Sequence, residues 1–321
     1  MTSTPISSIR RTALPFLLIV TLTAASLFTP VTRVVGSSMP FKVGTVLKSV
    51  VFLYYPKAGA FEVGTGFLVE IPSKADPKRT SVVMVTARHI VDPKWAGCSW
   101  ANPSALHALV NVKNYKYGVT KNSVDELQLD LGEAGKRTWY ASPNQRIDAA
   151  VLPLTDRQVA QLLQNDVRFL PVSDFATGAE TANYNVGIGD QIVTAGLVPA
   201  LLDTQRNYPA FKFGRISNIP EEPINMVCTK GDKSEPRDVW LLAGNYVGGN
   251  SGSPVFLLPT PPAAHRVMLI GIIAGAIPEV DLGQMVPSES VFAIIAAHYP
   301  NANLYRGRTA GTITKPTCCR Q

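Results

Sequence analysis

From residue 45 onward, short runs of hydrophobic and β-branched residues alternate with clusters of Gly, Pro, Asn and Asp. Such runs, separated by turn residues, are typical of antiparallel strands that close into barrels. The pattern therefore predicts an all-β fold. The predicted strands cover residues 45–55, 61–71, 81–87, 107–113, 148–154, 190–196, 210–219, 238–243, 253–258 and 267–275.

Two segments have the spacing of a helix. Residues Asp156 to Asp166 predict a short amphipathic helix near the midpoint of the chain, where a linker between two β domains would lie. A second helix is predicted to start at Pro287 and Ser288 with an N-cap, to present an apolar stripe, and to end before Pro300.

Composition and charge narrow the class of protein. Of 321 residues, 46% are hydrophobic and 17% are charged, which excludes a disordered chain and a coiled coil. The net charge is +7, of which two positive charges lie in residues 1–28 and four in residues 305–321. Only +1 remains for the rest of the chain, so we expect no nucleic-acid partner.

The first segment resembles an export signal. Arg10 and Arg11 precede an uncharged, largely apolar run of 16 residues from Ala13 to Phe28, shorter than the ~18–20 residues that span a bilayer. We expect residues 1–30 to be a signal peptide, or an uncleaved N-terminal anchor that provides the only membrane contact. The rest of the chain is then exported, as a periplasmic, secreted or membrane-anchored protein.

The four cysteines are too few for a disulfide-dense scaffold. Cys98 and Cys228 could pair in an oxidising compartment or could be two buried thiols, and Cys318 and Cys319 lie in a C-terminal tail. The chain has no metal-ligand spacing and no nucleotide-binding glycine pattern, so no cofactor or metal is expected.

The segment GGNSGSP (residues 248–254) contains a candidate nucleophile, Ser251. Glycines on both sides let a substrate backbone approach and free peptide N–H groups to stabilise an oxyanion. The G-x-S-x-G elbow of α/β-hydrolases is a near match, but Ser253 occupies its last position and a predicted strand follows instead of a helix. An esterase of that class would need Asp281 and His298 as partners of the serine.

A serine hydroxyl is a weak nucleophile and needs a base, which in turn needs an orienting group. His89 follows the apolar strand at residues 81–87, which places an imidazole at the end of a sheet. Asp148 opens another apolar run, where a buried carboxylate requires a hydrogen-bond donor such as a histidine N–H. Together with Ser251, these residues form a candidate Ser-His-Asp triad.

In this order the three residues resemble the chymotrypsin-like (trypsin-fold) serine proteases, of the bacterial trypsin-like peptidase type. The matching motifs are VTARHIV at 85–91, DAAVL at 148–152 and GGNSGSP at 248–254, with GTGFLV at 64–69 and IGIIAG at 270–275 in support. The resemblance spans residues 40–300 and implies two six-stranded antiparallel β-barrels with the active site between them.

The resemblance also implies domain limits. Residues 40–165 would form the first barrel and residues 166–300 the second barrel plus the C-terminal helix, followed by a tail at residues 301–321. The implied function is a serine endopeptidase that cleaves protein or peptide substrates through an acyl-enzyme intermediate.

The resemblance assigns further site residues. The N–H groups of Gly249 and Ser251 would form the oxyanion hole. Asn245 would lie near the base of the primary specificity pocket, and the absence of an acid there favours a small or medium apolar substrate side chain. One wall of this pocket is expected from Ala274, Gly275 and Ala276.

Among the positions that depart from the family pattern, two bear on activation and activity. Arg88 precedes the histidine, where many members have a small residue. Asn250 precedes the serine in place of an aspartate, so the activation step in which a new amino terminus pairs with that aspartate cannot operate. An alternative function is a catalytically inactive trypsin-fold binding module, in which Arg88 or a displaced loop disables the triad.

Overall fold

The computed structural model describes residues 43–305, apart from residues 58–59, 77, 133–135, 199–200, 202–205, 229–230 and 259–267. The predicted signal segment at residues 1–30, His265 and the cysteines Cys318 and Cys319 lie outside the described residues.

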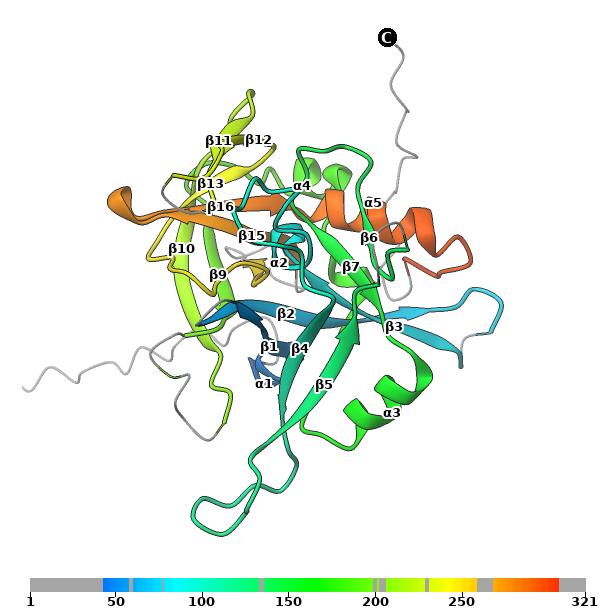
Figure 1. The fold of residues 1–321 in the computed structure, drawn as a ribbon. Coiled ribbons are helices and arrows are strands. Elements are labelled where there is room, and N and C mark those ends of the chain that lie inside the picture. Colours follow the sequence, from blue (N-terminus) through cyan, green and yellow to red (C-terminus); the bar gives the residue numbers. More distant parts are fainter. Residues whose placement is uncertain are drawn as a thin grey trace, which may run out of the picture. The chain divides into compact units, whose positions relative to one another are not determined.

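The first part of the described chain forms an eight-stranded, mostly antiparallel sheet (Figure 1). Its strands are β1 (Val50–Lys57), β2 (Ala60–Pro72), β3 (Thr80–Thr86), β4 (Ala105–Asn111), β5 (Val124–Asp130), β6 (Tyr140–Ala141), β7 (Ala150–Pro153) and β8 (Leu170–Pro171). The order is β5-β4-β1-β2-β3-β7-β6, and β8 pairs in parallel with β2. The first sheet thus extends beyond residue 165.

The second part forms a closed barrel of six antiparallel strands in the order β10-β13-β16-β15-β14-β9. These strands are β9 (Gln191–Gly196), β10 (Ala210–Asn218), β13 (Trp240–Ala243), β14 (Pro254–Leu257), β15 (Met268–Ile277) and β16 (Leu282–Pro287). A small hairpin of β11 (Ile224–Met226) and β12 (Glu235–Arg237) separates β10 from β13.

The predicted all-β class, a six-stranded barrel and the C-terminal helix are confirmed, with one difference in the first sheet. In the residues that the structure describes, β5 pairs only with β4, and β6 only with β7, so this sheet is open. Because β6 contains only two residues, it offers little edge for closing the sheet against β5.

The helices are short except for the last one. They are α1 (Val43–Ser49), α2 (Arg88–Val91), α3 (Asp156–Leu163), α4 (Gly178–Asn183) and α5 (Ser288–His298), with 3-10 turns η1 (Val172–Asp174) and η3 (Pro278–Val280). The prediction of strand for residues 45–49 is wrong, because α1 instead packs Val46 into the core and the Ser49 hydroxyl donates to Val46 O.

Both predicted helices are present. A capping box between Thr155 and Gln158 fixes the start of α3. In α5, Pro287 occupies the N-cap position, while the buried Ser288 hydroxyl donates to Ala176 O (2.6 Å) and so does not cap the helix.

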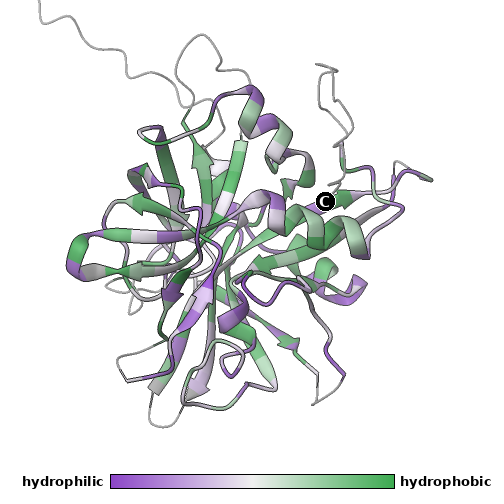
Figure 2. Ribbon diagram, turned by 90° about the horizontal axis from the view of Figure 1, so that it is seen from above, coloured by the Kyte–Doolittle hydropathy of each residue, from purple (hydrophilic) through white to green (hydrophobic). Residues whose placement is uncertain are grey.

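The hydrophobic core has three parts, and the strands supply most of it (Figure 2). One cluster lies within the first sheet and one inside the barrel. The largest cluster joins both sheets: Phe67 of β2 and Val85 of β3 pack with Phe256 of β14 and with Ile295 of α5. The two sheets are therefore held together by a shared core, which α5 helps to cover.

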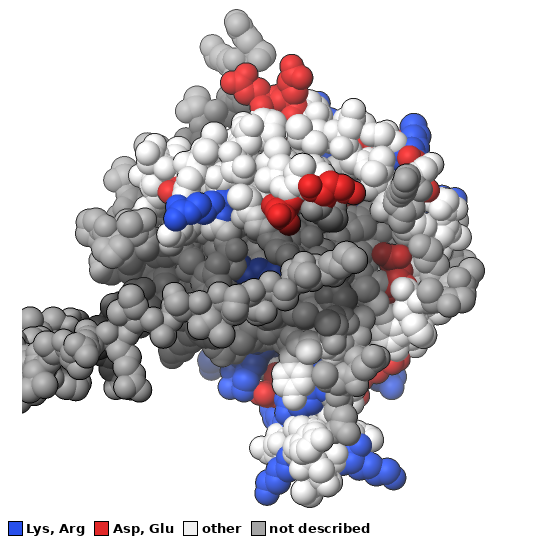
Figure 3. Space-filling view, turned by 90° about the vertical axis from the view of Figure 1, so that its left-hand side faces the viewer, with Lys and Arg blue, Asp and Glu red and all other residues white. Residues whose placement is uncertain are grey.

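The tip of the β4–β5 hairpin is exposed and basic. Tyr117 is 85% exposed and Val119 is 77% exposed. Lys113, Lys116 and Lys121 are also exposed, and Figure 3 shows Lys and Arg side chains gathered at this lower end of the molecule. None of the helices in the described residues is long and apolar enough to cross a membrane.

Candidate active site

His89 and Asp148 meet at the ends of two paired strands. His89 lies in α2, directly after β3, and Asp148 lies just before β7. Because β3 and β7 pair with Thr86 opposite Ala150, the residues beyond these positions are brought together. His89 Nδ1 lies 2.7 Å from Asp148 Oδ2, and the His89 backbone N–H donates to Asp148 Oδ1 (2.9 Å).

The two residues shift each other's pKa. Burial lowers the pKa of His89, but attraction to the Asp148 carboxylate and their hydrogen bond raise it by more, so the pKa lies above the ordinary value of 6.5. Burial raises the pKa of Asp148, but the His89 charge and hydrogen bonds outweigh it and bring the pKa below 3.8. The carboxylate is therefore ionised at neutral pH, and it stabilises a protonated imidazole.

Ser251 lies at the centre of a loop, residues 247–253, that connects to β14; we call it the nucleophile loop. Two successive turns shape it: Asn250 N–H donates to Val247 O (3.1 Å), and Ser253 N–H donates to Asn250 O (2.9 Å). The glycine of the second turn, Gly252, has φ +88°, and a Cβ there would overlap Thr65 O. Only glycine fits this position.

Thr65 of β2 connects the nucleophile loop to the first sheet. Its N–H donates to Ser251 O (2.8 Å), and its carbonyl accepts a bond from the Thr86 hydroxyl (2.8 Å) at the end of β3. Its own hydroxyl donates to Gly249 O (2.7 Å) and accepts from Leu197 N–H (3.1 Å). Ser251 is thus anchored beside the strand end that leads into His89.

The Ser251 hydroxyl donates to Ala274 O of β15 at 3.4 Å. Among the described residues, Ser251 Oγ makes no other hydrogen bond. In particular, Ser251 Oγ is not hydrogen-bonded to His89. The structure thus forms the His89–Asp148 bond and holds the nucleophile loop against the end of β3, while the Ser251 hydroxyl bonds to a neighbouring carbonyl.

Two amide groups of the nucleophile loop, those of Gly249 and Ser251, are not used in bonds within the described residues. Gly249 has φ +87°, and its carbonyl is bound by the Thr65 hydroxyl. These are the two donors that the sequence assigns to an oxyanion hole.

The predicted pocket residues lie in different environments. Asn245 is exposed, whereas its neighbour Tyr246 is 3% exposed, with its ring against Gly283 of β16. Ala274 is buried, and a Cβ on Gly275 would press on Gln284 Oε1 and Met226 Cε, each at 2.8 Å. Tyr246, Gln284 and Met226 were not predicted as site neighbours, because only the fold brings them to this strand.

Arg88, the unusual residue before the histidine, is buried and does not pair with any residue of the triad. Its guanidinium stacks on Trp95 (4.2 Å to the ring centroid) and forms an ion pair with Asp92 (3.3 Å). Its side chain is thus bonded to Asp92 and stacked on Trp95, and none of its hydrogen bonds in the described residues goes to His89.

Arg237 of β12 is a nearby charge that the sequence did not reveal. It is buried and stacks on the ring of Trp95, 3.9 Å from the ring centroid. Its charge contributes to the lowered pKa of Asp148 and offsets a small part of the rise in the pKa of His89. No sequence pattern relates Arg237 to Asp148, since 88 residues separate them.

Cys98 and Cys228 form a disulfide, with a Cα–Cα distance of 5.3 Å. The bond links the loop after α2 to the segment after β11, and hence the first sheet to the second half of the chain. Of the two alternatives that the sequence left open, the structure has the paired one.

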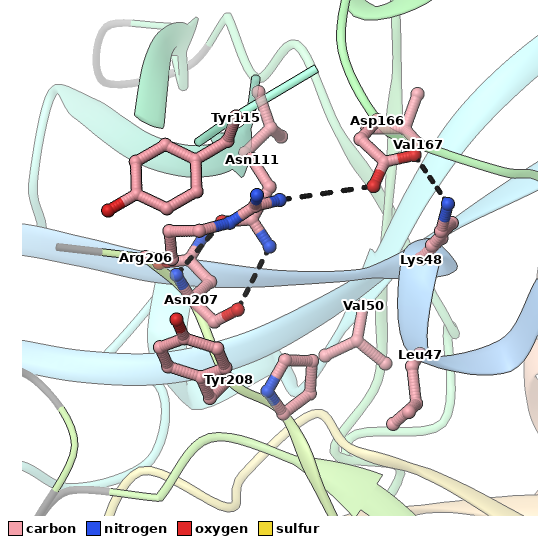
Figure 4. Close-up of a pocket in the computed structure, with 12 residues that line it drawn as sticks. Leu47, Lys48, Val50, Asn111, Tyr115, Asp166, Val167, Arg206, Asn207 and Tyr208 are labelled. Atoms are coloured by element: carbon pink, nitrogen blue, oxygen red, sulfur yellow. Dashed lines mark hydrogen bonds and ion pairs between the residues drawn. The ribbon is translucent and has the colours of Figure 1, made fainter. Parts of the chain in front are cut away.

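A pocket of about 280 Å³ lies away from these residues, between the end of β4, α1 and the segment before β10 (Figure 4). Its charged groups pair with one another: Lys48 Nζ lies 2.6 Å from Asp166 Oδ1, and Arg206 lies 3.9 Å from Asp166 Oδ2. It shares no lining residue with the triad or the nucleophile loop. The described residues contain no cluster of His, Cys, Asp and Glu suited to a metal ion.

No protein-family model matches the chain, and no curated protein does. Solved structures do match it. The chain is similar to serine proteases of known structure. The Rv3671c protease from M. tuberculosis, in its active form, is 16% identical over 81% of this chain and 83% of that chain, with a TM-score of 0.42.

Two further proteases give similar values. AL20, a thermostable serine protease from an extremophilic microorganism, is 15% identical over 79% of this chain and 97% of that chain, with a TM-score of 0.45. The protease Anisep from Arthrobacter nicotinovorans is 16% identical over 79% and 95%, also with a TM-score of 0.45. At such identities the chemistry must be argued from this chain's own residues.

Proposed function

We propose that the protein is a serine endopeptidase with His89, Asp148 and Ser251 as its triad. The observation that supports this most directly is the His89–Asp148 bond (2.7 Å) beside a glycine-flanked serine whose loop offers two unbonded N–H groups. A buried carboxylate on Nδ1 fixes the imidazole with its other nitrogen free to act as a base.

The proposed reaction begins when the Ser251 hydroxyl turns from Ala274 O toward His89 Nε2. The imidazole takes the hydroxyl proton as Oγ attacks the scissile carbonyl carbon, and Asp148 stabilises the imidazolium. The carbonyl oxygen becomes an oxyanion held by the N–H groups of Gly249 and Ser251. His89 then gives its proton to the leaving amine, and water releases the acyl group through the same steps.

We further propose that the substrate is a protein or peptide with a small or medium apolar side chain at the cleaved residue. The residues expected to line the specificity pocket support this, because Asn245 is not acidic and Ala274, Gly275 and Ala276 are small. We also propose that the protein is exported, which the Cys98–Cys228 disulfide supports, since such bonds persist in oxidising compartments.

A fluorophosphonate probe tests the proposed function. Full-length protein should be labelled at Ser251, as located by mass spectrometry, and Ser251→Ala and His89→Ala should each abolish labelling. The bond from Ser251 Oγ to Ala274 O favours a second candidate, an inactive binding module. Folded protein that shows no labelling would support that candidate over the endopeptidase.

A further inference from the structure

Lys212 of β10 makes a hydrogen bond into the nucleophile loop. Its Nζ donates to Asn250 Oδ1 at 2.8 Å. Lys212 is half-buried, and its pairing with Thr194 of β9 places it on the strand face that also carries buried Ile216 of the barrel core. An ammonium group inside a β-barrel is costly to bury, so its position there requires an explanation.

Asn250 is the residue that organises the nucleophile loop. It is 3% exposed and lies between Gly249 and Ser251, whose N–H groups form the proposed oxyanion hole. Its Oδ1 also accepts from Val247 N–H (3.0 Å), and its Nδ2 donates to Leu197 O (2.7 Å). Any movement of Asn250 therefore moves the two oxyanion donors on either side of it.

The chemistry of Asn250 explains why the cation bonds to an amide. The side chain must donate to Leu197 O and accept from Lys212 at the same time. An aspartate would accept both times and would face the Leu197 carbonyl with a second negative oxygen. Only a side chain with one donor and one acceptor satisfies both neighbours.

We infer that Lys212 is a positioning residue that holds Asn250, and through it the oxyanion donors, in the working arrangement. This inference rests on the proposed serine endopeptidase function. The cation comes from within the barrel, so the arrangement is complete without a newly formed amino terminus.

Among the groups around Lys212, its own ammonium is the one that loses a proton as the pH rises. Thr194 and Asn250 do not ionise, and burial raises the pKa of Tyr246, so that phenol stays neutral. No carboxylate pairs with Lys212 in the part of the chain that is described, and burial lowers its pKa below 10.5. We therefore expect activity to fall as pH rises through the Lys212 pKa, because the neutral amine is a weaker donor to Asn250 Oδ1 than the ammonium is.

Three full-length variants test the inference: Lys212→Met, Lys212→Arg and, as a matched control, Lys48→Met, which also removes a lysine contact (2.6 Å to Asp166). Lys212→Met should lower kcat by about tenfold or more with little change in KM, since misplaced donors weaken only the transition state. Lys212→Arg should retain activity and extend it to higher pH, because a guanidinium stays charged. Lys48→Met should match the wild type.

Hydrogen exchange of residues 245–257 at neutral pH gives a second readout that does not depend on catalysis. Lys212→Met should speed exchange of the Asn250 and Ser253 amides, which are bonded within the nucleophile loop. If Lys212→Met folds and has the same kcat and the same exchange rates of the Asn250 and Ser253 amides as the wild type, the inference is wrong. If Lys212→Met fails to fold, the test is Lys212→Arg. The inference is wrong if the activity of Lys212→Arg falls at the same high pH as that of the wild type.

These readouts separate the two proposals. If the wild type is not labelled by the fluorophosphonate, the proposed endopeptidase function fails. The exchange comparison then still decides whether Lys212 holds the loop, since unchanged protection in Lys212→Met would refute that role.

Discussion

At the residue scale, the site depends on one buried acid and its contact with an imidazole. Asp148 is 2% exposed, and both of its carboxylate oxygens bond to His89, one to the ring and one to the backbone. This double contact sets the position of α2 as well as the tautomer of the ring. The same contact raises the pKa of His89 above 6.5.

Replacing Asp148 with Asn should therefore change both rate and pH dependence. We expect kcat to fall by about 10⁴-fold, since an amide favours the wrong imidazole tautomer. The acid limb of kcat/KM should move to lower pH, because burial still lowers the pKa of His89 while the larger of the opposing effects, the charge and hydrogen bond of Asp148, are removed. Peptide hydrolysis measured between pH 4 and 9 checks both effects.

The exposed Asp156→Asn, in the first turn of α3, is a matched control that should leave the pH profile unchanged. In the proposed mechanism the neutral imidazole is the active form, so the activity of the wild type should rise as pH passes the raised pKa of His89. If the acid limb of Asp148→Asn lies at the same pH as that of the wild type, the Asp148 carboxylate does not raise the pKa of His89.

At the element scale, β2 is the strand that brings the two halves of the site into register. It pairs with β1, β3 and β8 in the first sheet, and through Thr65 it bonds to Ser251, Gly249 and Leu197 in the second half. The position of the serine relative to the histidine is thus set by backbone and hydroxyl bonds at a single residue of β2.

The variant Thr65→Val keeps the shape of this side chain and removes its hydroxyl. We expect a loss of about 1–3 kcal/mol of unfolding free energy, because the buried Leu197 N–H and Gly249 carbonyl lose their partner. Turnover should also fall while the fold is kept. Urea unfolding and kcat measure the two effects, and the exposed Thr80→Val of β3 serves as a control expected to change neither. An unchanged kcat in Thr65→Val would argue against β2 as the strand that sets the register.

At the scale of the whole molecule, three features join the open sheet to the barrel. They are the shared core cluster, α5, which contacts β7 as well as β15, and the Cys98–Cys228 disulfide. The candidate site lies where these halves meet, so its geometry depends on their remaining docked.

Removing the disulfide should weaken the whole unit. The bond closes a loop with a sequence separation of 130 residues, and loops of that size give about 2–5 kcal/mol of stabilisation. We expect Cys98→Ser/Cys228→Ser to lower the unfolding free energy by that amount in chemical denaturation. Adding a reductant should destabilise the wild type and leave the double variant unchanged. If the double variant unfolds at the same denaturant concentration as the wild type, the shared core and α5 alone account for the stability of the joined halves.

The sequence predicts the fold class well because most strands are apolar runs with clear turn boundaries. Among the described strands it misses β5, β6, β8, β11, β12 and β16, and the two longest of these, β5 and β16, are missed for physical reasons. β5 lies at the edge of the first sheet and carries Asp125, Glu126 and Asp130, whereas β16 contains Gly283 and the buried Gln284. Charged residues and glycine interrupt the apolar pattern that predicts a strand. These strands form because segments elsewhere in the chain pair with them.

The candidate site divides in the same way. His89, Asp148 and Ser251 stand in local motifs and can be read from the sequence alone. Thr65, Lys212, Tyr246 and Arg237 cannot, because each acts through a partner that only the fold brings near. The direction of the Ser251 hydroxyl, toward Ala274 O, is likewise a matter of side-chain rotation that no motif encodes.

The position of the disulfide determines what a proteolytic cut in the β4–β5 hairpin would do to the chain. The exposed β4–β5 hairpin tip, with Lys116 and Tyr117, is a natural place for a protease to nick the chain, and it lies between Cys98 and Cys228. A single cut there yields two fragments that stay covalently linked and paired through their strands. The protein would then migrate as one species on a non-reducing gel and as two after reduction, with the His89–Asp148 contact and the nucleophile loop held in one covalent unit before reduction.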